Sequence, residues 1–235
     1  MISVVIPAYN EEKYISLCLK SLLGQQTTRE FEVIVVDNNS KDKTAVVAKS
    51  YCHQLRLALV SCKKKGRGAA RAVGFKKAGG EIIFSTDADT VLPADWLERI
   101  AAEFQDKQVV AVTGSAKIND CGWLTNQIYN LIEPITVSCF RLFLGGYLLA
   151  GFNFAVLRKT YLQSTGFDPS INGMEDVDLS FKIARLGKVK FLRDVKVIVS
   201  GRRFKNGFLI GSWPYLTNFL KFLIKKENVY LKEVK

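Results

Sequence analysis

Two carboxylates, Asp87 and Asp89, stand one residue apart just beyond the apolar run GEIIF (80–84). If this segment stays extended, both side chains project to the same side of the backbone. Hard divalent cations prefer oxygen ligands and are often held by one or two carboxylates together with phosphate and water. The pair can therefore hold a cation that carries an anionic ligand. The alternative is a solvated turn ahead of the segment PADWLERI (93–100).

A second acidic pair, Glu175 and Asp176, stands at the start of the segment EDVDLSFKIARLG (175–187), which predicts a helix. A carboxylate in this position can take a proton from an attacking hydroxyl group, as a general base does. It can equally well complement the dipole at the N-terminus of the helix. Asp178 lies two residues further on and therefore points elsewhere around the helix.

Basic residues surround two glycines in the segment KKKGRGAAR (63–71): Lys63, Lys64, Lys65, Arg67 and Arg71. With the backbone N–H groups at the start of the next helix, the segment can bind an anion; otherwise it is a solvated basic loop. It lacks the full G-x-G-x-x-G spacing and does not follow the first strand, which argues against a nicotinamide cofactor. No G-x-x-x-x-G-K-[ST] loop is present either.

Asp37 follows the apolar run VIVV (33–36). Its carboxylate can accept a hydrogen bond from a nucleotide base or a ribose hydroxyl. The alternative is an Asx turn that closes the strand.

The apolar pattern of the first half predicts the elements that position these residues. β-branched runs predict strands over 2–9, 31–40, 55–62 and 80–87, and helical spacing predicts helices over 11–25, 41–54 and 68–78, the first with Asn10 as its N-cap. This alternation predicts a largely parallel sheet covered by helices on both faces. Ligands of open α/β sheets bind beyond the carboxyl ends of the strands, so the polar clusters should share one rim.

The second half is less regular. It predicts a helix over 94–105, a strand over 109–117, an apolar helical segment over 126–146 interrupted at Pro134, a strand and a short helix over 152–167, the helix over 175–187 and strands within 188–200. From Tyr215 onward, apolar residues at 215, 216, 219, 220, 222, 223 and 224 predict a basic amphipathic helix.

Five motifs, in this order and spacing, resemble the family 2 glycosyltransferases: PAYNEE (7–12), VVDNNSKDKT (35–44), GRGAARAVG (66–74), DAD (87–89) and MEDVDLSFKIARLG (174–187). The resemblance covers roughly residues 1–200. It implies the α/β GT-A fold, a Rossmann-like, mostly parallel central sheet with helices on both faces, here followed by a short amphipathic C-terminal helical tail. We expect a catalytic domain over 1–207, with a nucleotide-binding half (1–90) and an acceptor-binding half (91–207), and the tail over 208–235.

The resemblance also implies an inverting enzyme that moves a sugar from a UDP- or GDP-linked donor to a glycan or lipid-linked acceptor, with Mn²⁺ or Mg²⁺ as cofactor. By resemblance, Asp176 is the catalytic base and Asp89 binds the metal. The residues implied to bind the nucleotide-sugar are Pro7, Ala8, Tyr9, Glu11, Asp37, Arg67, Arg71, Asp87 and Glu175. Among them, Asp37 would contact the base, Arg71 the diphosphate region and Asp87 the ribose.

The chain departs from the family pattern in two places. The processive synthases of the family carry a Q-x-x-R-W motif after the base, where this chain has SGRRFKNG (200–207); we therefore expect single addition. Arg202 and Arg203 could grip a diphosphate or an anionic acceptor. No histidine follows Asp176, so metal binding would depend on Asp89 and phosphate oxygens.

Other hypotheses stay open. One is a non-catalytic protein of the same fold that binds a nucleotide-sugar or acts as a scaffold, and another is a polyprenyl-phosphate glycosyltransferase. A nucleotidyltransferase is disfavoured, because PAYNEE occupies the place of the Gly-rich basic loop that such enzymes usually carry after the first strand.

The composition bounds compartment and partners. The 235 residues are 48% hydrophobic, which suits one globular domain. The net charge of +12 favours anionic partners, although we expect no nucleic acid among them. Five scattered cysteines argue against a disulfide framework, and with no basic leader before the first strand we expect a cytoplasmic protein.

No run of about 18 clean apolar residues predicts a membrane-spanning helix. The basic amphipathic tail could instead lie on the inner face of the cell membrane as a peripheral contact. Its alternatives are packing on the catalytic domain or on a second copy in a homodimer.

Overall fold

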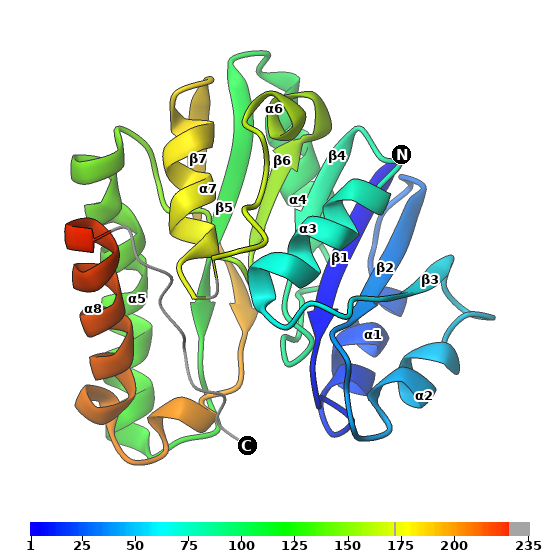
Figure 1. The fold of residues 1–235 in the computed structure, drawn as a ribbon, viewed down its shortest axis with the longest axis horizontal. Helices are drawn as coiled ribbons and strands as arrows, with labels where there is room; N and C mark the ends of the chain where they lie inside the picture. Colours follow the sequence, from blue (N-terminus) through cyan, green and yellow to red (C-terminus); the bar gives the residue numbers. More distant parts are fainter. Residues whose placement is uncertain (172, 226–235) are drawn as a thin grey trace.

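The computed structural model describes residues 1–171 and 173–225. Its strands form one seven-stranded sheet in the order β3–β2–β1–β4–β6–β5–β7 (Figure 1). The strands are β1 (Ile2–Ala8), β2 (Phe31–Asp37), β3 (Leu57–Ser61), β4 (Ile82–Ser85), β5 (Val109–Lys117), β6 (Phe154–Leu157) and β7 (Lys188–Ile198). Among the strands of the described residues, only β6 runs antiparallel to its neighbours, β4 and β5. The predicted mostly parallel α/β sheet is confirmed.

The helices follow the predicted order with shifted ends. They are α1 (Ile15–Leu23), α2 (Thr44–Lys49), α3 (Arg67–Lys77), α4 (Trp96–Ala102), α5 (Trp123–Leu144), α6 (Arg158–Gln163), α7 (Glu175–Ala184) and α8 (Phe208–Lys225), with 3₁₀ turns η1 (Glu103–Gln105) and η2 (Arg202–Phe204). Figure 1 shows α3 and α7 in front of the sheet.

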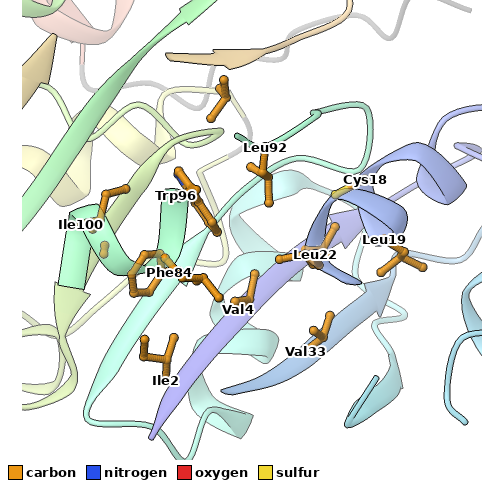
Figure 2. Packing of buried hydrophobic residues seen from close by; sticks show 14 of the residues in the cluster. Ile2, Val4, Cys18, Leu19, Leu22, Val33, Phe84, Leu92, Trp96 and Ile100 are labelled. Atoms are coloured by element: carbon orange, nitrogen blue, oxygen red, sulfur yellow. The ribbon is translucent and has the colours of Figure 1, made fainter. Parts of the chain in front are cut away.

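Alternation along β1 distributes apolar side chains to both faces of the sheet. Val4 joins Leu22 of α1 and Trp96 of α4 in one buried cluster, shown in Figure 2. Val5, one residue on, belongs to a second cluster that contains Phe75 of α3. Burying a large apolar side chain completely contributes about 1.5–3 kcal/mol, so both layers hold the strand ends in place.

Helix α3 lies unusually close to the sheet. A Cβ atom on Gly74 would come within 2.3 Å of Val5 Cγ1 and 2.9 Å of Val36 Cγ2. Only glycine permits this approach. It sets the position of Arg71, which lies three residues earlier on the same helix.

Two local predictions are wrong. Asn10 does not cap the first helix: it adopts a left-handed conformation (φ 54°), and its side-chain oxygen accepts a hydrogen bond from the N–H of Lys41 (2.8 Å). The helix begins only at Ile15, because residues 10–12 bond to the neighbouring loop instead. Pro134 does not interrupt α5, which runs through it. The buried Val137 and the contact of Phe140 with Phe219 anchor the helix beyond the proline.

The C-terminal helix α8 begins at Phe208, earlier than the predicted stripe. Phe219 and Phe222 pack into a small cluster with Met174 and Val177 of the α7 region. The apolar stripe is therefore partly used inside the molecule. Residues 226–235 of the predicted tail lie outside the described residues.

Candidate functional site

A cavity of about 500 Å³ opens beyond the carboxyl ends of β1, β2 and β4, in the size range of small-molecule sites. Its lining includes seven of the predicted site residues: Pro7, Ala8, Tyr9, Glu11, Arg67, Asp87 and Asp89. The structure therefore brings these seven residues together in one cavity, six from the ends of β1 and β4 and the loops after them, and Arg67 from the start of α3. Asp37, Arg71, Glu175 and Asp176 are not part of the lining.

The loops after β1 and β2 are tied together by hydrogen bonds. The backbone N–H of Glu11 donates to the hydroxyl of Thr44 (2.8 Å), and that of Glu12 donates to Asp42 (3.2 Å). In return the N–H of Lys43 donates to the carboxylate of Glu12 (2.9 Å). These bonds hold one wall of the cavity rigid, which explains much of the polar composition of PAYNEE and NNSKDKT.

Asp37 closes a turn. Its carboxylate accepts a hydrogen bond from the N–H of Ser40, three residues further on (3.3 Å). The Asx turn that was the alternative to base binding would bond to the residue two positions on, so the strand closes by a wider turn. Its neighbour Asn38 is buried and lines the cavity. The Asn38 amide donates to the carbonyls of Cys62 and Lys64, and its oxygen accepts from Gly66. Contact of Asp37 with a base stays a prediction.

Arg71 joins the two acidic motifs. It is 2% exposed, and its guanidinium donates to Glu175 of α7 and, at 2.5 Å, to Asp87. Its Nε lies 3.4 Å from the hydroxyl of Ser85. A buried carboxylate without a partner is expensive, so the arginine allows Glu175 and Asp87, which are far apart in sequence, to lie side by side.

Asp176 lies next to this cluster. The N–H of Val177 donates to its Oδ1 (2.9 Å) and the N–H of Gly151 approaches its Oδ2 at 3.4 Å. Burial, and then the charge of Glu175, raises the pKa of Asp176 to about 6, although Arg71 and the two N–H groups act in the opposite direction. A carboxyl with this pKa is ionised at neutral pH and is a better proton acceptor than an ordinary aspartate.

Arg202 joins two further carboxylates from the other side of the cavity. Its Nη2 lies 2.5 Å from Glu11 and 3.1 Å from Asp89, and its guanidinium lies over the ring of Tyr14, 5.2 Å from the centroid. Burial, and then the nearby charge of Asp87, raises the pKa of Asp89 to about 7, while Arg202 lowers it. The sequence suggested an anion-gripping role for Arg202 but not these partners.

Arg67 faces the cavity without a carboxylate partner: across residues 1–171 and 173–225, no ion pair or hydrogen bond of its guanidinium is found. Burial alone would lower its pKa, but Asp87, Tyr215 and Glu175 together raise it. The Lys65 ammonium lies 5.8 Å from the ring centroid of Tyr9. These cations give the basic loop a place for an anionic ligand.

The donor atoms suit a phosphate-bound cation better than a bare metal site. Among the described residues, no group of three or more histidine, cysteine or acidic side chains is placed to hold a metal. Asp87, Asp89 and Glu11 nevertheless line one cavity. Their negative charges repel one another, and a bound cation would reduce that repulsion. Divalent cations that keep several waters and phosphate oxygens need only one or two such carboxylates, so the residues fit Mn²⁺ or Mg²⁺ bound together with a phosphate ligand.

The second half of the chain supplies the opposite wall of the cavity. Tyr129 of α5, Phe204 of η2 and Tyr215 of α8 all line it. The rings of Tyr129 and Phe204 pack at 4.9 Å, and the Arg203 guanidinium lies over Tyr215. No motif in the sequence marked these aromatic residues as part of a cavity wall.

Comparison with known proteins identifies a family. The family described as "Glycosyl transferase family 2" matches residues 3–168, which confirms the resemblance drawn from the five motifs. Chondroitin synthase of Escherichia coli is 28% identical over 206 residues, covering 83% of this chain and 28% of that protein. Poly(ribitol-phosphate) beta-N-acetylglucosaminyltransferase TarS of Staphylococcus aureus is 38% identical over 103 residues, covering 43% of this chain and 18% of that protein. The chain thus spans less than a third of either relative.

Solved structures share the fold. TarS 1–349 of S. aureus in complex with UDP-GlcNAc superposes with a TM-score of 0.68 at 24% identity, over 85% of this chain and 58% of that one. The mannosyltransferase PcManGT from Pyrobaculum calidifontis, in complex with GDP-Man and Mn²⁺, gives 0.68 at 24% identity, over 92% of this chain and 64% of that one. The expected GT-A fold is confirmed.

Proposed function

Because the chain belongs to glycosyl transferase family 2, whose members transfer sugars from nucleotide-sugars, we propose that it is an inverting, single-addition glycosyltransferase with Asp176 as its base. One observation carries the proposal: Arg71 bridges Glu175, the neighbour of Asp176, to Asp87 in the cavity. Asp176, the predicted proton acceptor, therefore follows directly on a residue whose arginine partner also contacts Asp87 in the predicted nucleotide site. A site that only bound the donor would not need a carboxyl with a raised pKa there.

The donor would occupy the cavity with its diphosphate toward Asp89 and Arg67. Bound Mn²⁺ or Mg²⁺ would supply stabilisation of the charge that develops on the leaving nucleoside diphosphate. Arg67 has no competing ion pair among the described residues and can donate to a phosphate oxygen. Tyr9, with Lys65 beside its ring, offers an aromatic face to the base.

The acceptor would approach from the side of Asp176 and Gly151. Its hydroxyl oxygen forms the bond to the anomeric carbon while the bond to the diphosphate breaks, and its proton passes to Asp176. Attack opposite the leaving group inverts the anomeric centre. The two backbone N–H groups hold the carboxylate in a fixed orientation, so little reorganisation is needed for the transfer.

The neighbours suggest donors and acceptors to test. The structures of TarS 1–349 and PcManGT are complexes with UDP-GlcNAc and GDP-Man, which supports a UDP- or GDP-linked sugar here. The acceptor is proposed to be a glycan or a lipid-linked glycan. Single addition rests on SGRRFKNG at the place of the processive motif; a ladder of products longer than one added sugar would refute it.

The deciding experiment is a thermal-shift panel of nucleotide-sugars with and without Mn²⁺. A ligand that binds only the native state raises the melting temperature, by an amount that grows with ligand concentration over Kd. We expect one UDP- or GDP-linked sugar to stand out, and only with the metal. No shift with any of them would refute the proposal. A shift without transfer to any acceptor would favour the non-catalytic alternative.

Peripheral membrane contact is a second, separable proposal. Leu209, Trp213, Leu216 and Leu220 follow one face of α8 and are 81%, 66%, 51% and 47% exposed. No helix in the described part of the chain is both long and apolar enough to cross a membrane. An exposed apolar face on a chain of net charge +12 fits an anionic lipid surface.

Flotation with vesicles of anionic lipid tests this contact. The double variant Trp213→Glu/Leu216→Glu should stay with the soluble fraction while the unaltered chain floats. The double variant Leu17→Glu/Val46→Glu, which adds the same two charges at exposed apolar positions of α1 and α2, is the matched control. Equal flotation of all three would exclude the contact, and loss of a dimer in the double variant on size-exclusion chromatography would assign the face to a second copy instead.

A further inference from the structure

Arg202 places one nitrogen between two carboxylates of the cavity. Nη2 lies 2.5 Å from Oε1 of Glu11 and 3.1 Å from Oδ2 of Asp89, and Nη1 lies 2.9 Å from the second oxygen of Glu11. All three side chains are largely buried. A positive nitrogen held by two acidic oxygens occupies the kind of position that a hydrated cation takes between carboxylates.

Asp89 is the residue expected to bind the metal, so the arginine and the cation need the same carboxylate. A divalent cation beside Asp89 would also lie close to the guanidinium and be repelled by it. The Arg202 guanidinium and the divalent cation therefore compete for the carboxylate of Asp89. Phosphate oxygens, by contrast, match the fork of an arginine.

We propose that Arg202 takes the place of the divalent cation in the donor-free protein and exchanges Asp89 for the donor's phosphates when the donor and cation bind together. The inference rests on the proposed function and adds to it an order of events. The donor-free protein binds the divalent cation weakly on its own. The phosphates of the nucleotide then supply the negative charge that draws Arg202 away from Asp89.

The backbone around Arg202 allows this exchange to involve the side chain alone. The N–H of Gly201 donates to Asp120 (2.7 Å), and the carbonyl of Gly201 accepts from the thiol of Cys121 (3.1 Å). Phe204, two residues after Arg202, packs on Tyr129. The ring of Tyr14 under the guanidinium supports a cation through its π face in either position. The side chain can therefore turn between carboxylate and phosphate without moving η2.

Calorimetric titration of the full chain with Mn²⁺ alone, and then with UDP and GDP at saturating Mn²⁺, tests the exchange. Arg202→Ala should bind Mn²⁺ alone at least about tenfold more tightly, and the nucleotide at least about tenfold more weakly, each the size expected for one charge-assisted contact. Arg99→Ala is the matched control. Arg99 lies on α4 and pairs with Asp95 and Asp194, and its replacement removes the same single positive charge. We expect neither effect from it.

Opposite changes in the two affinities separate the exchange from damage to the fold, which would weaken both. Arg202→Met, which keeps an apolar stem over Tyr14, repeats the test if the alanine variant does not fold. Unchanged or weaker binding of Mn²⁺ alone in both variants would overturn the proposal while leaving the glycosyltransferase assignment intact. Failure of the unaltered chain to bind either nucleotide with Mn²⁺ would instead overturn the assignment.

Discussion

Replacing Asp176 by asparagine should stabilise the protein while removing its activity. Burial and the charge of Glu175 raise the pKa of Asp176 from 3.8 to about 6, so the ionised form is held in the fold at a cost. This difference in pKa corresponds to about 3 kcal/mol. Asparagine avoids this cost, but its NH₂ group can no longer accept from the N–H of Gly151, which forfeits about 1 kcal/mol.

The expected net gain is about 1–2 kcal/mol at pH 8, or a melting temperature higher by roughly 2–8 °C for a chain of this size. The gain depends on pH with a definite sign. A raised carboxyl pKa means that the folded protein binds the proton more tightly than the unfolded chain. The advantage of asparagine is therefore complete above about pH 6 and fades as the pH falls through 6 toward 4, where Asp176 itself becomes neutral.

Three measurements check this reasoning: thermal melts at pH 8 and pH 5, calorimetry with the donor identified by the thermal-shift panel, and a transfer assay. Transfer should fall by at least about 10²–10⁴-fold, as expected for loss of a general base, with donor affinity nearly unchanged. Asp178→Asn is the control on the same helix, since Asp178 pairs with Lys182 at 2.6 Å; it should lose a little stability and keep transfer. A lower melting temperature of Asp176→Asn at pH 8 would refute the cost assigned to the ionised carboxylate. Retained transfer would refute the role of Asp176 as the base.

Three further predictions follow from the same contacts. Transfer by the unaltered chain at saturating donor and Mn²⁺ should fall to half near pH 6, measured as kcat, and not near pH 4 as for an ordinary aspartate, because Asp176 must be ionised to accept a proton. Gly151→Ala should weaken nucleotide binding and lower the melting temperature, since the new Cβ would lie 2.5 Å from Nη2 of Arg71; Gly122→Ala, with open space around it, is its control. Asp89→Ala should remove the gain in UDP or GDP affinity that Mn²⁺ provides in calorimetry, and a variant that keeps that gain would exclude Asp89 as a ligand.

The first half of the site could be predicted because its signals are local. Each of β1, β2 and β4 is a short apolar run followed at once by polar residues, and parallel strands bring those ends to one rim. Pro7, Tyr9 and Asp87 lie in the cavity for that reason alone. What local patterns missed were bonds between loops. The sequence predicts Asn10 as a helix cap, yet its side-chain oxygen accepts a hydrogen bond from the N–H of Lys41, 31 residues further on.

The second half could not be predicted to the same depth, because its contribution depends on long-range packing. An apolar stripe says which face of a helix is buried but not what covers it. Tyr215 therefore gave no sign that it lines a cavity, and the pairing of Arg202 with Glu11 spans 191 residues. The antiparallel placement of β6 between β4 and β5 likewise follows from the whole sheet and from no motif.

The site contains two ion-pair clusters, each formed by one arginine and two carboxylates. Arg71 holds Glu175 and Asp87, and Arg202 holds Glu11 and Asp89, so each arginine brings together two carboxylates whose charges would otherwise repel each other. With two carboxylates to one arginine, each cluster keeps one negative charge in excess, while Arg67 in the same cavity has no ion pair among the described residues. A divalent cation matches the excess carboxylates, and a diphosphate matches Arg67. Each component also neutralises the charge of the other, and for this reason the geometry favours binding of both together.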